Sequence, residues 1–185
     1  MKFKQYCLTT WSIIDPLYFR FTRLHYVEKA TGENTIMRVR LTKYKGRNIV
    51  LSDGTRIYKN DILIKIHLHN VELLKQIQGY DNELRRALMI YKTVKESLPF
   101  IVRHIQIHDH GNKIKGLIGI TMLYKGCHKL GFETYSITNP FYKYFKKAAL
   151  LPIYLLSSSS MVIKEVPSPV YLFMSKDHLI NQYGK

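Results

Sequence analysis

Residues 35–69, TIMRVRLTKYKGRNIVLSDGTRIYKNDILIKIHLH, decide the fold class of this chain. Across residues 35–44, basic and aromatic side chains alternate with apolar ones, the period of two that a strand with one buried face requires. A second strand is predicted over 47–51 and a third over 62–69, with an Asp-Gly turn at 52–55 between them. The stretch therefore predicts a small antiparallel meander.

Helical and strand patterns alternate on both sides of this meander. Asp15-Pro16 is typical of a helix N-terminus, and the helical spacing behind it continues to about Glu28. Further helices are predicted at 71–78, from an Asp81 cap to about 107 with a kink or restart at Pro99, at 123–130, at 139–156, and behind a cap at Ser175 or Asp177. Strands are predicted at 114–122, 132–137 and 170–174. We expect one α+β domain over residues 1–185, its antiparallel sheet covered by helices.

The chain is strongly basic. It carries 29 Lys and Arg against 13 Asp and Glu, a formal net charge of +16 in 185 residues. Such a charge attracts anionic membrane surfaces and other polyanions, with nucleic acid as a less favoured partner. A Lys-rich surface that serves solubility explains the same composition. The N-terminal residues lack the long apolar stretch of a secretory leader, so the expected location is the cytoplasm, including the inner face of the membrane.

Two basic segments are candidate binding surfaces. In the meander, Arg38, Arg40, Lys43 and Arg47 are the predicted anion-binding residues, because charge and aromatic side chains interleave there. A solvated sheet face explains this pattern nearly as well.

The helix predicted at 139–156 mixes aromatic and basic residues next to an apolar run, as interfacial helices do. The alternative is a core helix with a basic outer edge. The predicted membrane-surface residues are Phe141, Lys143, Tyr144, Lys146 and Lys147.

Histidines are the weaker candidates for chemistry. In the strand 62–69, period two places His67 and His69 on one face with Lys65. These two histidines and Asn70 are the candidate catalytic residues, and His67, His69, His108 and His110 are the candidate metal ligands. The spacing matches no metalloenzyme motif, and histidines that satisfy polar surface are the more common case, so no metal or cofactor is predicted. Cys127 and His128 are adjacent on a predicted helix and point apart, which makes them a poor catalytic dyad.

Four blocks of the sequence resemble the YkoP-like domain family of Bacillus and relatives: Ile64–Asn70, Gly119–Gly126, Lys129–Glu133 and Leu172–Leu179. The resemblance runs from the meander to the last helix. It implies a link to the cell envelope, because similar domains are attached to polysaccharide deacetylases. The metal motifs of those enzymes are missing here, since His104 and His108 have the HxxxH spacing but no paired aspartates precede them. The resemblance therefore implies an accessory domain rather than a deacetylase.

Three functional hypotheses follow. The first is a non-catalytic accessory or binding domain that attaches to anionic membrane. The second is an enzyme, metal-dependent or not, that uses the face of His67, His69 and Asn70 on a carbohydrate or phosphate substrate. The third is a nucleic-acid-binding protein.

Overall fold

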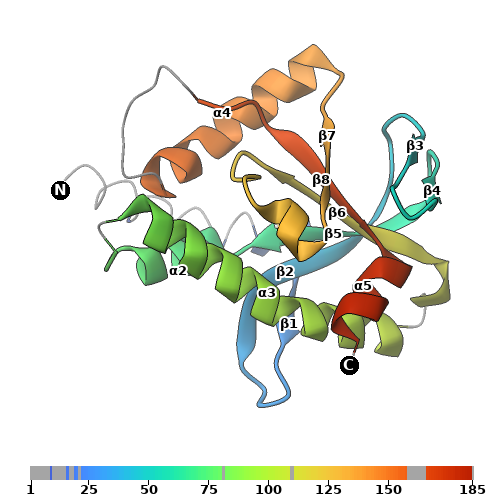
Figure 1. The fold of residues 1–185 in the computed structure, drawn as a ribbon, viewed down its shortest axis with the longest axis horizontal. Helices are drawn as coiled ribbons and strands as arrows, with labels where there is room; N and C mark the ends of the chain where they lie inside the picture. Colours follow the sequence, from blue (N-terminus) through green and yellow to red (C-terminus); the bar gives the residue numbers. More distant parts are fainter. Residues whose placement is uncertain are drawn as a thin grey trace.

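The computed structural model describes residues 22–80, 82–108, 111–157 and 166–184, together with residues 9, 16, 19 and 20. Six strands of this part form a mixed sheet in the order β1-β2-β5-β6-β8-β7 (Figure 1). All neighbours are antiparallel except β5 and β6, which run parallel. The strands are β1 (His25–Glu28), β2 (Asn34–Lys43), β5 (Ile62–Leu68), β6 (Ile114–Thr121), β7 (Glu133–Ser136) and β8 (Val170–Ser175).

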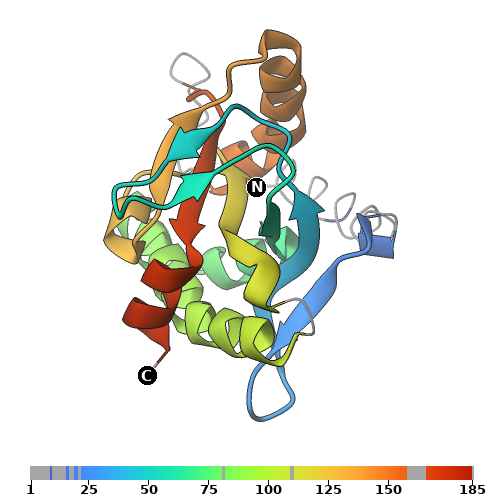
Figure 2. The same ribbon diagram turned by 90° about the vertical axis from the view of Figure 1, so that its right-hand side faces the viewer.

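Helices cover both faces of this sheet, which confirms the predicted α+β class. The helices are α2 (Asn70–Ile77), α3 (Glu83–Ile107), α4 (Pro140–Ser157) and α5 (Lys176–Tyr183), with short 3-10 turns η1 (Gly111–Lys113) and η2 (Cys127–Leu130). α3 and α5 pack on one face, and α4 lies on the other side of the strands (Figures 1 and 2). The unit β5–α2–α3–β6 connects the two parallel strands.

The main core lies between the sheet and α3. Val94, Leu98, Ile101 and Ile105 recur at helical spacing and are buried. Burying each of these side chains contributes about 1.5–3 kcal/mol to the free energy of folding. This burial offsets the cost of Pro99 inside α3, so the helix stays continuous there. The first apolar residues of α3 lie outside this core. The exposed members are Leu84 at 75% and Leu88 at 64% exposure.

The predicted meander is wrong in its middle strand. β2 pairs directly with β5 over seven residue pairs, from Met37–Leu68 to Lys43–Ile62. The chain between them forms a separate two-stranded sheet of β3 (Ile49–Val50) and β4 (Arg56–Ile57). Buried Ile57 of this hairpin belongs to a second core with Leu63 and Phe173, on the sheet face opposite α3. Apolar residues in the hairpin therefore fold back over the sheet instead of extending it.

The helix predicted to run to Glu28 is also wrong at its end. His25–Glu28 is strand β1, with His25 opposite Val39 of β2. Pairing along an open sheet edge overrides the local helical spacing. Asp15 and Asp81, predicted as helix caps, lie outside the described residues.

The caps that the structure does describe show the expected chemistry. The Asn82 side chain caps α3 by accepting a hydrogen bond from the backbone N–H of Leu84 (2.8 Å). The predicted Ser175 cap of α5 is confirmed, with its Oγ accepting from His178 N–H (2.9 Å).

Candidate functional site

The pairing between the parallel strands β5 and β6 ends before the strands themselves do. Their pairing stops at Lys65 and Ile118, although β5 continues to Leu68 and β6 to Thr121. Over these last residues β5 stays paired with β2, and β6 stays paired with β8. Past the last β5–β6 pair, each strand therefore keeps the partner on its outer side, and we call this stretch the opening between β5 and β6.

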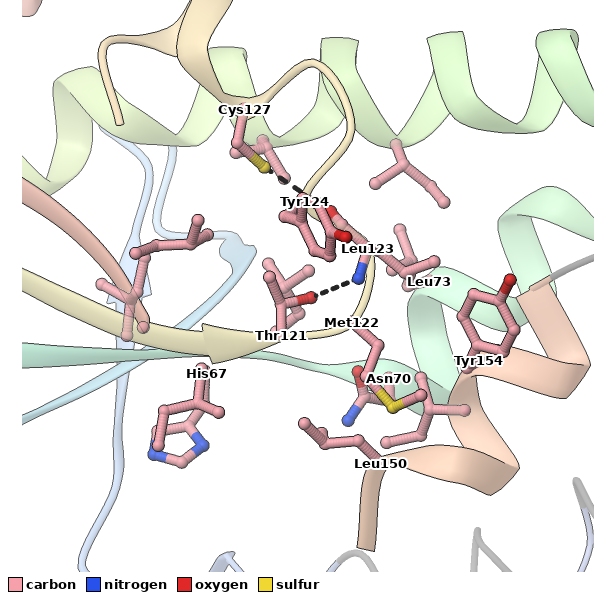
Figure 3. Close-up of a pocket in the computed structure, with 18 of the residues that line it drawn as sticks. His67, Asn70, Leu73, Thr121, Met122, Leu123, Tyr124, Cys127, Leu150 and Tyr154 are labelled. Carbon is pink, nitrogen blue, oxygen red and sulfur yellow. Dashed lines mark hydrogen bonds between the residues drawn. The ribbon is translucent and has the colours of Figure 1, made fainter. Parts of the chain in front are cut away.

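A cavity of about 390 Å³ lies at this opening, and residues 66–68 of β5 and 119–121 of β6 line it. The start of α3, the middle of α4 and the loop after β6 enclose it (Figure 3). In open sheets with parallel strands, ligands bind outside the carboxyl ends of those strands. The largely apolar lining, with a few polar groups among it, is typical of small-molecule sites.

On the α3 side the cavity wall is apolar. Tyr91 and Val94 come from α3, and Cys127 and Phe132 come from the chain that follows β6. Gly119 allows close packing against Ile66 here, because a Cβ atom at this position would lie 3.2 Å from Ile66 Cγ1. Burial raises the pKa of the Cys127 thiol to about 11, and its Sγ donates to the carbonyl of Leu123 (3.5 Å). The protonated thiol is a lining group rather than a nucleophile.

On the α4 side the same cavity is cationic. Lys65 and His67 project from β5, Arg38 from β2, and Lys146 from α4. Figure 3 shows His67 on the opposite side of the strands from Tyr124 and Cys127. The cavity therefore reaches both faces of the sheet through the opening between β5 and β6.

The register of β2 and β5 concentrates this charge. Arg40 lies opposite Lys65, and Arg38 lies opposite His67. Burial, then the charges of Lys146 and Arg40, lowers the pKa of Lys65 to about 8. Burial and Arg40 also lower the pKa of Lys146.

The same surroundings keep His67 neutral. Burial, followed by the charge of Lys65 and three further cations, lowers its pKa to about 3. Glu83 is the one acidic side chain among the described residues that line the cavity. Positive charge gathered in a partly dehydrated wall is costly in the empty protein, and an anion at that wall would offset the cost.

The predicted anion-binding residues do not form one surface. The expectation of a solvated basic face is wrong for Arg38, which is only 3% exposed. Its guanidinium lies 4.9 Å from the Phe19 ring and 4.8 Å from the Tyr26 ring, and it donates to the Tyr26 hydroxyl (2.6 Å). Half-buried Arg40 donates to the carbonyl of Thr22 (3.1 Å). Exposed Lys43 and Arg47 lie away from the cavity lining.

The predicted catalytic residues are only partly brought together. His67 and Asn70 both line the cavity, whereas His69 does not. The His69 ring lies 5.9 Å from the Tyr26 ring, and its backbone begins α2.

The predicted metal ligands are separated. His108 follows the end of α3, where its ring lies 5.9 Å from that of His104. The chain then enters β6 at Ile114, which pairs with Ile62 at the start of β5, so His108 and His67 lie toward opposite ends of that strand. His110 lies outside the described residues. Within residues 22–80, 82–108, 111–157 and 166–184, no group of three or more His, Cys, Asp or Glu residues could hold a metal ion.

The predicted membrane-surface residues of α4 divide between two sides of the helix. Phe141 and Tyr144 are 86% and 75% exposed. Lys146 lines the cavity, with its Nζ atom 5.5 Å from the Phe145 ring. Half-buried Lys143 and Lys147 lie outside the lining. Among the described helices, none is both long enough and apolar enough to cross a membrane.

Sequence reasoning missed how the cavity is assembled. Gly119 and Tyr91 both line the cavity, and the local sequence pattern around them gave no sign of this. One signal was present: Lys65 is a lone cation inside the apolar strand ILIKIHL, which is an unusual position for lysine.

Comparison with known proteins gives one consistent result. The chain is 45% identical over 178 residues to the protein named "Uncharacterized protein YkoP" of Bacillus subtilis (strain 168), and the match covers 96% of both chains. No solved structure matches it. The family model for the YkoP domain matches residues 4–183, so the chain belongs to the YkoP domain family.

Proposed function

We propose that this domain binds an anionic amphipathic small molecule in the cavity between β5 and β6. The apolar part of the ligand lies against α3, and its phosphate or carboxylate lies against Lys65 and Lys146. The observation that supports this proposal is the joining of an apolar wall and a cationic wall in one cavity of about 390 Å³. An isolated apolar pocket or an isolated basic patch would not require such a ligand.

The energetics favour an anion with an apolar tail over either part alone. Each ångström squared of apolar surface removed from water contributes about 25 cal/mol, and the α3-side wall supplies that surface. A unit charge about 4 Å from Lys65 contributes roughly 4 kcal/mol at an effective dielectric constant of about 20, before desolvation is subtracted. The role we propose is that of a non-catalytic accessory domain, with neutral His67 as a hydrogen-bonding neighbour of the anion.

Octyl phosphate is a simple probe for this site. We expect saturable binding of octyl phosphate by isothermal titration calorimetry. Octyl glucoside lacks the anion and inorganic phosphate lacks the apolar tail, so we expect both to bind at least about tenfold more weakly. Lys146→Ala is expected to weaken octyl phosphate binding about tenfold, the size of a charge-assisted contact. Lys147→Ala is the matched control, because Lys147 is on the same helix but outside the lining. Equal affinities for wild type and Lys146→Ala would contradict the proposal.

The exposed end of α4 supports a second proposed role, attachment to anionic membrane. Phe141, Tyr144 and Phe145 are 86%, 75% and 65% exposed, within one turn of each other at the start of the helix. Aromatic side chains next to lysines are favourable at the level of lipid headgroups.

Co-sedimentation with vesicles tests this second role. We expect the double variant Phe141→Ser, Tyr144→Ser to bind phosphatidylglycerol vesicles several-fold more weakly than wild type, because two apolar contacts are removed. Tyr58→Ser is the control, since Tyr58 is also exposed, at 45%, but lies next to β4. Binding that the double variant retains, or that competing RNA removes completely, would indicate generic charge attraction instead.

A further inference from the structure

We infer that the ligand of the cavity is a single-chain anionic lipid, and that it passes directly between the cavity and a membrane surface along α4. This inference rests on the proposed function and deepens it, because it names the class of ligand and joins the cavity and the exposed end of α4 in one role. Three observations support it: the face of α4 that borders the cavity, the position of Lys146, and the direction of the cavity's polarity.

The first observation is that one face of α4 borders the cavity. The residues of this helix that line it are Lys146, Ala149, Leu150, Ile153 and Tyr154. Their spacing of three and four residues places them on one side of a helix. Ala149 is exposed to solvent as well as being part of the lining, so the cavity meets the protein surface beside α4.

The second observation is the position of Lys146 along the helix. The exposed aromatic residues Phe141, Tyr144 and Phe145 come before the lining stretch and lie outside the described lining. Lys146 follows them directly, and its Nζ atom lies 5.4 Å from the Tyr142 ring and 5.5 Å from the Phe145 ring. The same side chain lines the cavity. When the aromatic end is in contact with lipid headgroups, this lysine is therefore close both to the membrane surface and to an anion in the cavity.

The third observation is the direction of the cavity's polarity. Its cationic wall is on the α4 side, and its apolar wall, with Val94 and Phe132, is on the α3 side. A lipid that enters beside α4 with its acyl chain first therefore leaves its anionic group near Lys146. The volume of about 390 Å³ is near the lower end of the range for small-molecule sites, which suits one acyl chain rather than the two chains of a phospholipid.

Transfer of cis-parinaric acid, a fluorescent single-chain fatty acid, from the intact protein to phosphatidylglycerol vesicles tests this inference. Passage at the membrane surface requires a collision, so the transfer rate of wild type is expected to rise in proportion to the vesicle concentration. The double variant Phe141→Ser, Tyr144→Ser is expected to transfer the fatty acid at least about tenfold more slowly, at a rate that no longer depends on the vesicles. Its affinity for octyl phosphate should equal that of wild type, because both residues lie outside the described lining.

A second double variant, Leu84→Ser, Leu88→Ser, is the matched control. These residues are also large, apolar and exposed, at 75% and 64%, but they lie at the start of α3, the other helix that borders the cavity. We expect this variant to transfer cis-parinaric acid at the wild-type rate. If it is slowed and the α4 variant is not, the lipid passes on the α3 side and the inference is overturned.

The same measurements separate the inference from the proposed function. A wild-type transfer rate that does not depend on vesicle concentration would show that the ligand leaves through water, which overturns the inference. Failure of cis-parinaric acid to bind, with octyl phosphate still bound, would exclude a single-chain lipid. In both cases the proposed function stands. If neither ligand binds, both are overturned.

Discussion

Replacing Lys65 with methionine is expected to stabilise the empty protein at pH 7 and to abolish binding of an anionic ligand. The Lys65 side chain is half-buried on β5, opposite Arg40 and near Lys146. Methionine has a similar shape, fits the apolar surroundings and removes the like-charge repulsion. The same substitution removes the cation that we place against the ligand's phosphate.

The sign and size of this effect follow from the lowered pKa. The pKa of Lys65 falls from its ordinary value of 10.5 to about 8 in the folded protein. Above pH 10.5 the side chain is neutral in both states and has no electrostatic cost. The cost grows as pH falls from 10.5 to 8 and is complete below pH 8, because the folded state then holds an unfavourable charge. Each pKa unit corresponds to about 1.4 kcal/mol, so after allowance for partial exposure we expect a gain of about 2 kcal/mol at pH 7.

Urea unfolding at pH 7 measures the stability gain, and octyl phosphate titration measures the loss of binding. Lys115→Met is the control, since Lys115 is an exposed lysine on the neighbouring strand β6 and should change neither quantity much. A Lys65→Met protein that is less stable than wild type, or that still binds octyl phosphate with wild-type affinity, would refute the role of Lys65.

The elements with a strong local period could be predicted from the sequence. β2, β5, α2 and α4 follow alternating or helical patterns of apolar residues, and Ser175 is a local N-cap. Which strands pair with each other was harder to predict from the sequence, because pairing depends on contacts between distant segments. The hairpin of β3 and β4 could have continued the meander by its local pattern. It packs instead over Leu63 and Phe173, more than a hundred residues apart in the chain.

The candidate site was also only partly predictable from the sequence. The alternation of Arg38 and Arg40 correctly placed both residues on one face of a strand. It did not predict that Arg38 is buried, because Phe19 and Tyr26 cover that face and their positions are not encoded in the strand's own period. The opening between β5 and β6 is a parallel, long-range feature, and a single sequence gives no local signal for where such pairing ends.

The topology explains why the opening and the charge occur together. β5 and β6 are each paired on their outer sides, so their mutual pairing can end at Lys65 and Ile118 without loss of their other partners. The face of β5 that carries Lys65 and His67 then borders the opening, and α4 adds Lys146 from the other side. The cluster of like charges is costly in the empty protein, and the anionic ligand that we propose would offset that cost.

Replacing His67 with glutamine is expected to protect the protein against acid unfolding. The pKa of His67 falls from its ordinary value of 6.5 to about 3, chiefly through burial and then through the charges of Lys65 and other cations. Between these two pH values the unfolded chain binds a proton that the folded protein does not. Stability therefore falls as pH drops from 6.5 toward 3, and this loss is absent when residue 67 cannot titrate.

The expected difference is large. Between pH 7 and pH 4 the wild-type free energy of unfolding should fall by about 3 kcal/mol more than that of His67→Gln, at about 1.4 kcal/mol per pKa unit. Urea unfolding at pH 7, 5.5 and 4 measures this difference, and any constant cost of the substitution cancels because only the pH dependence is compared. His128→Gln is the control, since His128 is exposed and should leave the acid response unchanged. If the free energy of unfolding depends on pH in the same way for wild type and His67→Gln, His67 is not held neutral. The cationic wall would then be more hydrated than its burial implies.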